Sequence, residues 1–156
     1  MKKTNAMRIL ENENVDFEII EYSKDEGISG IEVADNLGED RNRVFKTLVT
    51  ESKEEENYVF VVPASSELDL KKAAKVSNSK KIEMIPQKKL LPLTGYVHGG
   101  CSPVGMKKSF KTFIDSSAED FDFFYVSGGK VGMQIKVNPK SLIEAIDGSF
   151  ADIKKE

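Results

Sequence analysis

Residues 99–108 read Gly-Gly-Cys-Ser-Pro-Val-Gly-Met-Lys-Lys, so three glycines, a serine, a proline and two lysines fall within ten positions. Glycine lets the backbone approach a ligand and adopt a positive φ, and consecutive N–H groups can then converge on one oxygen atom. A second run of this character, Ser-Gly-Gly-Lys at residues 127–130, follows an apolar segment. The two runs together indicate a site for a ligand that carries a phosphate or a carbonyl group.

The composition limits the class of protein. With 156 residues, of which 39% are hydrophobic, the chain can bury one sizeable core, and we expect residues 1–156 to form a single domain. The single cysteine excludes an intrachain disulfide, and no apolar segment has the length of a signal peptide core or of a membrane span. We therefore expect a cytoplasmic protein that does not associate with a membrane. We also expect no bound metal ion and no cofactor.

The net charge of −3 hides an uneven distribution. Residues 71–111 contain ten lysines and one acidic residue, Glu83, so this window has a charge of +9 and the remainder of the chain −12. A basic surface on an acidic body is typical of proteins that bind a polyanion such as RNA. Alternatively, the lysines are solvated positions on helices and loops. Because the first glycine run lies in the same window, we favour contact with RNA.

The hydrophobic pattern predicts helices and strands that alternate with short connections. Helices are expected from Thr4 onward and at residues 29–37, 68–76, 87–91 and 139–146, with Ser29 as a cap. Strands are expected at residues 17–22, 43–50, 58–62, 81–85, 96–98, 113–115, 123–127 and 131–137. This order predicts an α+β domain whose mixed, largely antiparallel sheet is strongly curved, like a barrel, and surrounded by helices.

Lys46 is out of character in its predicted strand. Alternation places it on the face of Val44 and Leu48, while Phe45 and Val49 make the other face apolar as well. An ammonium in such a strand is costly unless it opens into a cleft that holds a negative partner. The alternative is that its stem lies on apolar surface and the amine reaches water at the strand end. We favour a functional role.

Three segments carry a resemblance to a known family. They read Leu-Asp-Leu-Lys-Lys at residues 68–72, Thr-Gly-Tyr-Val-His-Gly-Gly-Cys-Ser-Pro-Val-Gly at 94–105, and Tyr-Val-Ser-Gly-Gly-Lys at 125–130. Together they resemble the YbaK/EbsC family, small free-standing aminoacyl-tRNA deacylases of the Cys-tRNA(Pro) type. These are similar to the editing insertion domain of bacterial prolyl-tRNA synthetase. The resemblance spans nearly the whole chain and implies the fold of that family.

The resemblance also implies roles for individual residues. Lys46 matches the family's strand lysine, which is thought to orient the 3′-terminal adenosine and phosphate of the tRNA. The family's loop that holds the aminoacyl carbonyl oxygen by backbone N–H groups matches Gly99, Gly100, Cys101, Ser102 and Pro103. The remaining substrate-binding positions match Tyr22 at the pocket mouth, Thr47, Ser127, Gly128 and Gly129.

The implied chemistry is substrate-assisted, because the sequence offers no convincing catalytic triad. Ester cleavage needs a nucleophile, stabilisation of the oxyanion and a proton for the leaving ribose hydroxyl. In the route that the resemblance implies, the cysteinyl thiol attacks its own carbonyl and leaves as a cyclic thiolactone. A rival hypothesis makes Cys101 the nucleophile and His98 its base. We disfavour it, since residues three apart on an extended strand point to opposite faces and a lone cysteine is more often a small buried residue.

Two positions depart from the family pattern, and other functions remain open. Val131 stands where family members often have a basic residue, and Gln134 where some have an acid. The alternatives are a deacylase for Ala-tRNA(Pro) or another mischarged tRNA, a non-catalytic tRNA-binding module, and an unrelated small-molecule hydrolase. The expected substrate is the acceptor end of a mischarged tRNA. Because so small a domain has no anticodon-reading part, the resemblance implies prolyl-tRNA synthetase as the partner that selects the tRNA.

Overall fold

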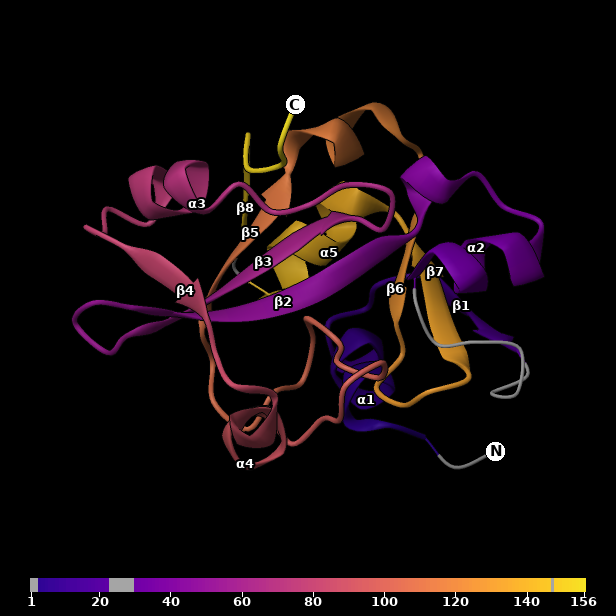
Figure 1. Cartoon of the computed structure of the whole chain (residues 1–156). Helices are drawn as coiled ribbons and strands as arrows, with labels where there is room; N and C mark the ends of the chain where they lie inside the picture. Colours follow the sequence, from indigo (N-terminus) through magenta and orange to yellow (C-terminus); the bar gives the residue numbers. More distant parts are fainter. Residues whose placement is uncertain (1–2, 23–29, 147) are drawn as a thin grey trace.

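The computed structural model describes residues 3–22, 30–146 and 148–156, and the strands of this part of the chain form two sheets (Figure 1). The smaller, antiparallel sheet has the order β1 (Phe17–Glu21), β7 (Met133–Val137), β6 (Phe124–Ser127). The larger has the order β4 (Ile82–Met84), β2 (Phe45–Ser52), β3 (Asn57–Pro63), β5 (Lys111–Asp115), β8 (Ser149–Ala151). In the larger sheet, β5 runs parallel to both β3 and β8, and the remaining pairs are antiparallel.

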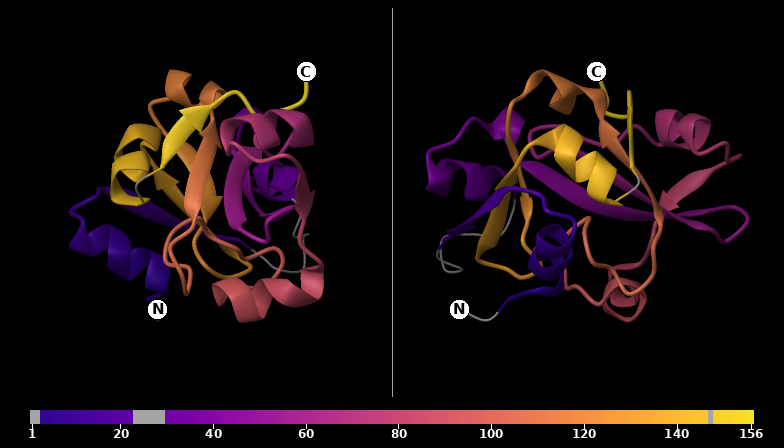
Figure 2. Two further views of the ribbon diagram at one scale, coloured as in Figure 1. Left: turned by 90° about the vertical axis from the view of Figure 1, so that its left-hand side faces the viewer. Right: turned by 180° about the vertical axis from the view of Figure 1, so that it is seen from behind.

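Helices cover both faces of the larger sheet. The α-helices are α1 (Asn5–Asn12), α2 (Gly30–Leu37), α3 (Leu70–Val76), α4 (Leu90–Thr94) and α5 (Pro139–Ile146), and the 3₁₀ helices are η2 (Arg41–Arg43), η3 (Gln87–Lys89) and η4 (Ser116–Asp120). In the right-hand view of Figure 2, which shows the molecule from behind, α5 lies in front of the larger sheet. In Figure 1, α3 lies on the opposite face of this sheet. No helix of the described residues is long and apolar enough to cross a membrane.

The alternation of β3 explains why the sheet is covered on both sides. Val59 and Val61 belong to the core cluster that includes Leu142 of α5, whereas Phe60 and Val62 pack with Ala73 of α3. Successive strand residues point to opposite faces, so a run of consecutive apolar residues needs a layer on each side. All four β3 side chains are fully buried. This strand therefore forms the centre of the molecule.

The two sheets meet where β2 begins. Val44, just before β2, forms an isolated parallel bridge with Tyr125 of β6. The rings of Phe45 and Phe124 pack edge to face with their centroids 5.0 Å apart, a favoured geometry for aromatic pairs. Figure 1 shows β2 running from this junction across the middle of the molecule to β4. The junction brings the next residue of β2, Lys46, close to the end of β6.

The α+β class and the mixed, largely antiparallel pairing are confirmed. The strands form two sheets, and within the described residues these do not close into a barrel. Thr4 caps α1 as expected, its hydroxyl accepting from the Met7 N–H at 3.3 Å. The α3 helix begins at Leu70 rather than at residue 68, because the Asp69 side chain caps it. The cap expected at Ser29 lies outside the described residues.

Two sequence expectations need correction. Residues 96–98, expected as a strand, are irregular, because Gly95 ends α4 in a left-handed conformation with φ of 86° and Gly100 N–H donates to the Val97 carbonyl at 3.0 Å. The β8 strand was not predicted. It has three residues, too few for an alternating pattern to be recognised.

Asp115 ties the end of β5 to the C-terminal segment. Its carboxylate is buried and accepts three backbone N–H groups, from Ile153 at 3.0 Å, Lys154 at 3.1 Å and Ser117 at 3.1 Å. We expect Asp115→Ala to lower the free energy of unfolding by about 3 kcal/mol, because three donors lose an ionised acceptor. Urea unfolding followed by circular dichroism measures this. The exposed Asp120→Ala is the control, and an equal loss in both variants would contradict the assignment.

Candidate active site

A cavity of about 400 Å³ lies where the start of β2 meets the ends of β6 and β7. One wall comes from β2, a second from the first glycine run, and apolar residues of α2 and α4 close the sides. The lining residues are Val33, Val44, Phe45, Lys46, Thr47, Leu48, Ala64, Leu90, His98, Gly99, Cys101, Ser127 and Gln134. A mostly apolar hollow with a few convergent polar groups is typical of a small-ligand site.

Lys46 is the only lysine among the described residues that line the cavity. It is half-buried, and it makes no ion pair or hydrogen bond with the residues that the structure describes. Burial lowers the pKa of Lys46 below the ordinary lysine value, and the carboxylate of Glu67 opposes this shift. A cation held in this way gains most from an anionic ligand, which would restore the interaction that burial removed.

Two polar side chains of the cavity lack partners. The Thr47 Oγ1 and Gln134 Oε1 atoms are buried without a hydrogen-bond partner, and Gln134 is only 5% exposed. Gln134 of β7 is the cross-strand neighbour of Ser127 at the end of β6, which also lines the cavity. A buried polar atom without a partner costs about 1–3 kcal/mol, so a ligand that meets these atoms regains that energy.

The two glycine runs pack against each other. A Cβ atom on Gly100 would lie 2.8 Å from the Val131 nitrogen and 2.9 Å from the Lys130 Cα, both backbone atoms. Only glycine therefore fits between the runs. Its neighbour Gly99 has φ of 84°, which favours glycine for a second reason. This contact sets the position of the Gly99–Cys101 backbone at the cavity wall.

The start of α1 clamps both glycine runs from outside. The Thr4 hydroxyl donates to the Gly128 carbonyl at 2.6 Å, and the Asn5 amide donates to the Gly105 carbonyl at 2.7 Å. Tyr96 adds a buried bond from its hydroxyl to the Val104 carbonyl at 2.6 Å. Burial raises the pKa of Tyr96 to about 12, so the hydroxyl keeps the proton that it donates.

Comparison with known proteins identifies the family. A family model described as "Aminoacyl-tRNA editing domain" matches residues 26–145, which is more than half of the chain. The chain belongs to the aminoacyl-tRNA editing domain family. A protein of Enterococcus faecalis (strain ATCC 700802 / V583), described as "Putative Cys-tRNA(Pro)/Cys-tRNA(Cys) deacylase EbsC", is 44% identical over 153 residues, which cover 97% of this chain and 93% of that protein. The family expected from the glycine runs is thus confirmed.

Solved structures show the same fold at low sequence identity. The crystal structure of a hypothetical protein superposes with a TM-score of 0.90 at 20% identity, covering 97% of this chain and 100% of that one. A second, described as "a putative trans-editing enzyme for prolyl tRNA synthetase", gives a TM-score of 0.87 at 22% identity and covers 100% of both chains. The editing-domain fold therefore extends over the two sheets described above.

The structure brings about half of the predicted site residues to the cavity wall. Those that line it are Lys46, Thr47, Gly99, Cys101 and Ser127. Gly100, Gly128 and Gly129 lie behind it, in the contacts between the glycine runs and α1. The buried Ser102 hydroxyl accepts from the Val104 N–H at 3.2 Å.

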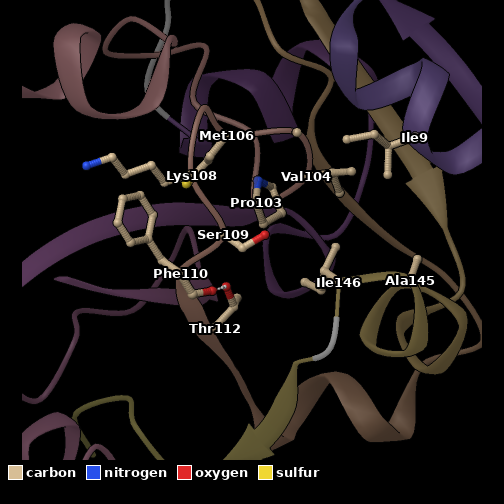
Figure 3. A pocket seen from close by; sticks show the side chains of 11 residues that line it. Ile9, Pro103, Val104, Met106, Lys108, Ser109, Phe110, Thr112, Ala145 and Ile146 are labelled. Carbon is tan, nitrogen blue, oxygen red and sulfur yellow. Dashed lines mark hydrogen bonds between the residues drawn. The ribbon is translucent and has the colours of Figure 1, made fainter. Parts of the chain in front are cut away.

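Two predicted residues lie elsewhere. Pro103 lines a second cavity, of about 240 Å³, between α1, α5 and residues 103–112 (Figure 3). Tyr22 packs with Val44 and Tyr125 beside α2, and its hydroxyl is buried without a partner. It is not among the described residues that line the 400 Å³ cavity.

Sequence reasoning missed several lining residues. His98 was expected on a strand, but it is an exposed turn residue at the cavity, and its imidazole makes no hydrogen bond with the described residues. Gln134 was noted only as a departure from the family. Its pairing with Ser127 across the β6–β7 hairpin is the signal that would have placed it. Val33 and Leu90 come from helices whose facing side the sequence does not specify.

Because of the close contact at Gly100, we expect a substitution there to reduce activity more than it reduces stability. Gly100→Ala pushes residues 130–131 away and displaces the Gly99–Cys101 backbone, so we expect aminoacyl-tRNA deacylation to slow by about 10²–10³-fold, the usual effect of losing an oxyanion donor. Single-turnover rates measure this. The control is Gly148→Ala, which also crowds its neighbours, at 3.3 Å, but far from the cavity. Equal activities of the two variants would refute the role of the contact.

Cys101 is predicted to be dispensable for chemistry. Burial raises the pKa of its thiol to about 12, despite an opposing hydrogen bond with Thr94, so the thiol is protonated at neutral pH and is a poor nucleophile. We expect Cys101→Ala to deacylate within about threefold of wild type, since only a small buried side chain is lost. If Cys101→Ala were folded by circular dichroism but inactive, Cys101 would be the nucleophile after all.

Proposed function

We propose that this protein is a trans-editing aminoacyl-tRNA deacylase that removes cysteine from Cys-tRNA(Pro), acting in the cytoplasm as a single domain over residues 1–156. The 44% identity to the EbsC protein over 97% of the chain supports this substrate class. The observation that carries the proposal is the cavity itself. It holds an ammonium that makes no ion pair, two unpartnered polar atoms and loop backbone at its wall, but no activated nucleophile within the described residues.

Lys46 would anchor the 3′ end of the tRNA. A phosphate oxygen brought to its ammonium supplies the direct ionic contact that the half-buried amine lacks among the described residues. The unpartnered Thr47 Oγ1 and Gln134 Oε1 atoms are then available to the ribose hydroxyls and the amino group of the ester. In this arrangement the protein holds the aminoacyl ester in one orientation. Such positioning can by itself supply a large part of the rate enhancement of an enzyme.

The first glycine run would stabilise the oxyanion. The Gly100 N–H already donates to the Val97 carbonyl, which leaves the N–H groups of Gly99 and Cys101 at the cavity wall without a partner among the described residues. Donors fixed in advance toward the developing negative charge stabilise the tetrahedral intermediate more than flexible donors do. We assign the oxyanion hole to these two groups, which narrows the expectation from the whole of residues 99–103.

The nucleophile would come from the substrate. No hydrogen bond within the described residues joins a serine, threonine or cysteine of the cavity to a basic side chain. The cysteinyl sulfur of the substrate attacks its own carbonyl carbon, and the bond from that carbon to the ribose oxygen breaks. The thiol proton goes to the ribose oxygen, so the products are a four-membered thiolactone and the free tRNA end. Water later opens the thiolactone to cysteine.

This route selects the amino acid rather than the tRNA. Serine and alanine lack the thiol, so a cavity that only positions the ester discriminates against them chemically. The EbsC protein carries both Cys-tRNA(Pro) and Cys-tRNA(Cys) in its name, which accords with recognition of the cysteinyl group. We propose that prolyl-tRNA synthetase supplies the missing tRNA selection by handing over its mischarged product.

The decisive measurement compares chemically matched substrates. We expect Cys-tRNA(Pro) to be deacylated at least about 100-fold faster than Ser-, Ala- or S-methylcysteinyl-tRNA(Pro), because only the first has a free thiol. Lys46→Ala should lower kcat/KM about 100-fold, as expected when one partner of a desolvated charge pair is removed. Lys53→Ala, at the far end of the same hairpin, is the exposed control.

Each outcome bears on one part of the proposal. Release of cysteine at no more than the buffer rate would overturn the deacylase function. Cleavage of the S-methylated substrate at the rate of the free thiol would overturn the substrate-assisted step but not the deacylase. Faster deacylation of Ala-tRNA(Pro) than of Cys-tRNA(Pro) would identify Ala-tRNA(Pro) as the substrate instead.

A further inference from the structure

The lysines of residues 71–111 fall into two groups on the surface. Figure 1 shows α3, β4 and α4 in succession along one side of the molecule. Near α3 and β4 acidic residues lie close by, and Lys72 and Lys81 pair with them, at 3.0 Å from Asp152 and 2.9 Å from Glu83, whereas Lys71, Lys75 and Lys80 make no ion pair within the described residues. Around α4 the situation differs, because residues 84–114 contain no acidic residue at all. The exposed Lys88 and Lys107 have no ion pair within the part of the chain that the structure describes.

Lys88 and Lys107 lie along one line with an exposed apolar side chain. Lys88 precedes Leu91 by three residues and Leu91 precedes Gly95 by four, spacings that put residues on the same side of a helix. Gly95 has no side chain, and the stem of Lys107 occupies its place, with carbons 3.3–3.8 Å from where a Cβ atom would stand. The Lys107 N–H also donates to the Thr94 carbonyl at 3.0 Å.

Two large apolar side chains are exposed in the chain segment between Lys88 and Lys107. Leu91 is 51% exposed and Val97 is 47% exposed, two of the four large hydrophobic residues that the described surface leaves open. We call Lys88, Leu91, Val97 and Lys107 the α4 strip. Lys108 does not belong to it, because its side chain lies at the second cavity (Figure 3).

The α4 strip borders the cavity of the candidate active site. Leu90 precedes Leu91 and His98 follows Val97, and both Leu90 and His98 line that cavity. The strip therefore offers a path along which a polymer whose end occupies the cavity can leave it. At this point the polymer must be a single strand, since the cavity of about 400 Å³ admits no duplex.

We propose that the α4 strip binds the unpaired 3′ end of an RNA, just upstream of the terminal nucleotide. Base faces would lie on Leu91 and Val97, while phosphates would pair with Lys88 and Lys107. Cations that alternate with flat, exposed apolar surface suit single-stranded nucleic acid, which offers phosphates and base faces in alternation. The inference rests on the proposed function only in taking the cavity as the place of the RNA terminus.

The test separates the strip from the remaining lysines. Fluorescence anisotropy measures the Kd of an uncharged acceptor-stem hairpin with an unpaired 3′ end, over a range of salt concentrations. We expect Lys88→Gln/Lys107→Gln to raise Kd by about tenfold at about 0.1 M salt and to reduce the slope of log K against log salt by roughly 1.4, the value for two phosphates on a single strand. The matched control, Lys71→Gln/Lys75→Gln on α3, removes the same charge from exposed positions and should leave both quantities unchanged.

The apolar half of the strip has its own test. Leu91→Ser/Val97→Ser should weaken binding of the tailed hairpin and leave binding of a blunt hairpin unchanged, because only the tail reaches the strip. Equal loss for both hairpins, or equal effects of the strip and control lysines, would overturn the proposal. So would a strip variant that binds the hairpin normally but loses stimulation by prolyl-tRNA synthetase, since the strip would then be a protein-docking surface.

A minimal ester distinguishes failure of this inference from failure of the proposed function. We expect 3′-O-cysteinyl adenosine to be cleaved equally by the wild type and the Lys88→Gln/Lys107→Gln variant, because it does not reach the strip. If the wild type cleaves neither this ester nor Cys-tRNA(Pro), the proposed deacylase function is wrong. The hairpin titrations still test whether the α4 strip binds RNA.

Discussion

The site depends on one close contact between backbones, that of Gly100 with Lys130 and Val131. It joins the two glycine runs, which are separated along the chain by the strands β5 and β6 and the 3₁₀ helix η4. Without a side chain between them, the runs form one wall, and the N–H groups of Gly99 and Cys101 acquire a fixed direction. The junction of β2 with β6 then places Lys46 at the same cavity. The absence of a side chain at Gly100 thus allows the two runs to pack together.

The cavity also shows that the fold tolerates unfavourable groups where a ligand can use them. A half-buried ammonium that makes no ion pair and two buried polar atoms without partners all reduce stability in the free protein. These three groups lie together at one cavity, whereas the other unpartnered buried hydroxyls, those of Tyr22 and Ser117, do not line it. Elsewhere buried charge is compensated, as at Asp115, where three backbone donors meet the carboxylate. This contrast is a physical reason to regard the cavity as the functional site, independent of any resemblance.

The sequence predicted well those features that depend on local chemistry. Thr4 as a helix cap, the antiparallel β2–β3 hairpin and the unusual position of Lys46 follow from spacing and side-chain type alone. It predicted poorly those that depend on long-range packing. The left-handed Gly95 and the bond from the Gly100 N–H to the Val97 carbonyl turned the strand predicted at residues 96–98 into irregular structure. The placement of His98 and Gln134 at the cavity needed the arrangement of both sheets, which no local pattern contains.

The clamp at the start of α1 has a consequence for the order in which activity can arise. Thr4 and Gly128, joined by a 2.6 Å hydrogen bond, are 124 positions apart in the chain. During synthesis the N-terminal side of the clamp appears first, but it has no partner until the second glycine run has emerged. The cavity wall formed by the glycine runs is therefore completed late, when both sheets can form. A nascent or partly unfolded chain has no assembled site with which to attack correctly charged tRNA, so hydrolytic competence is reserved for the finished molecule.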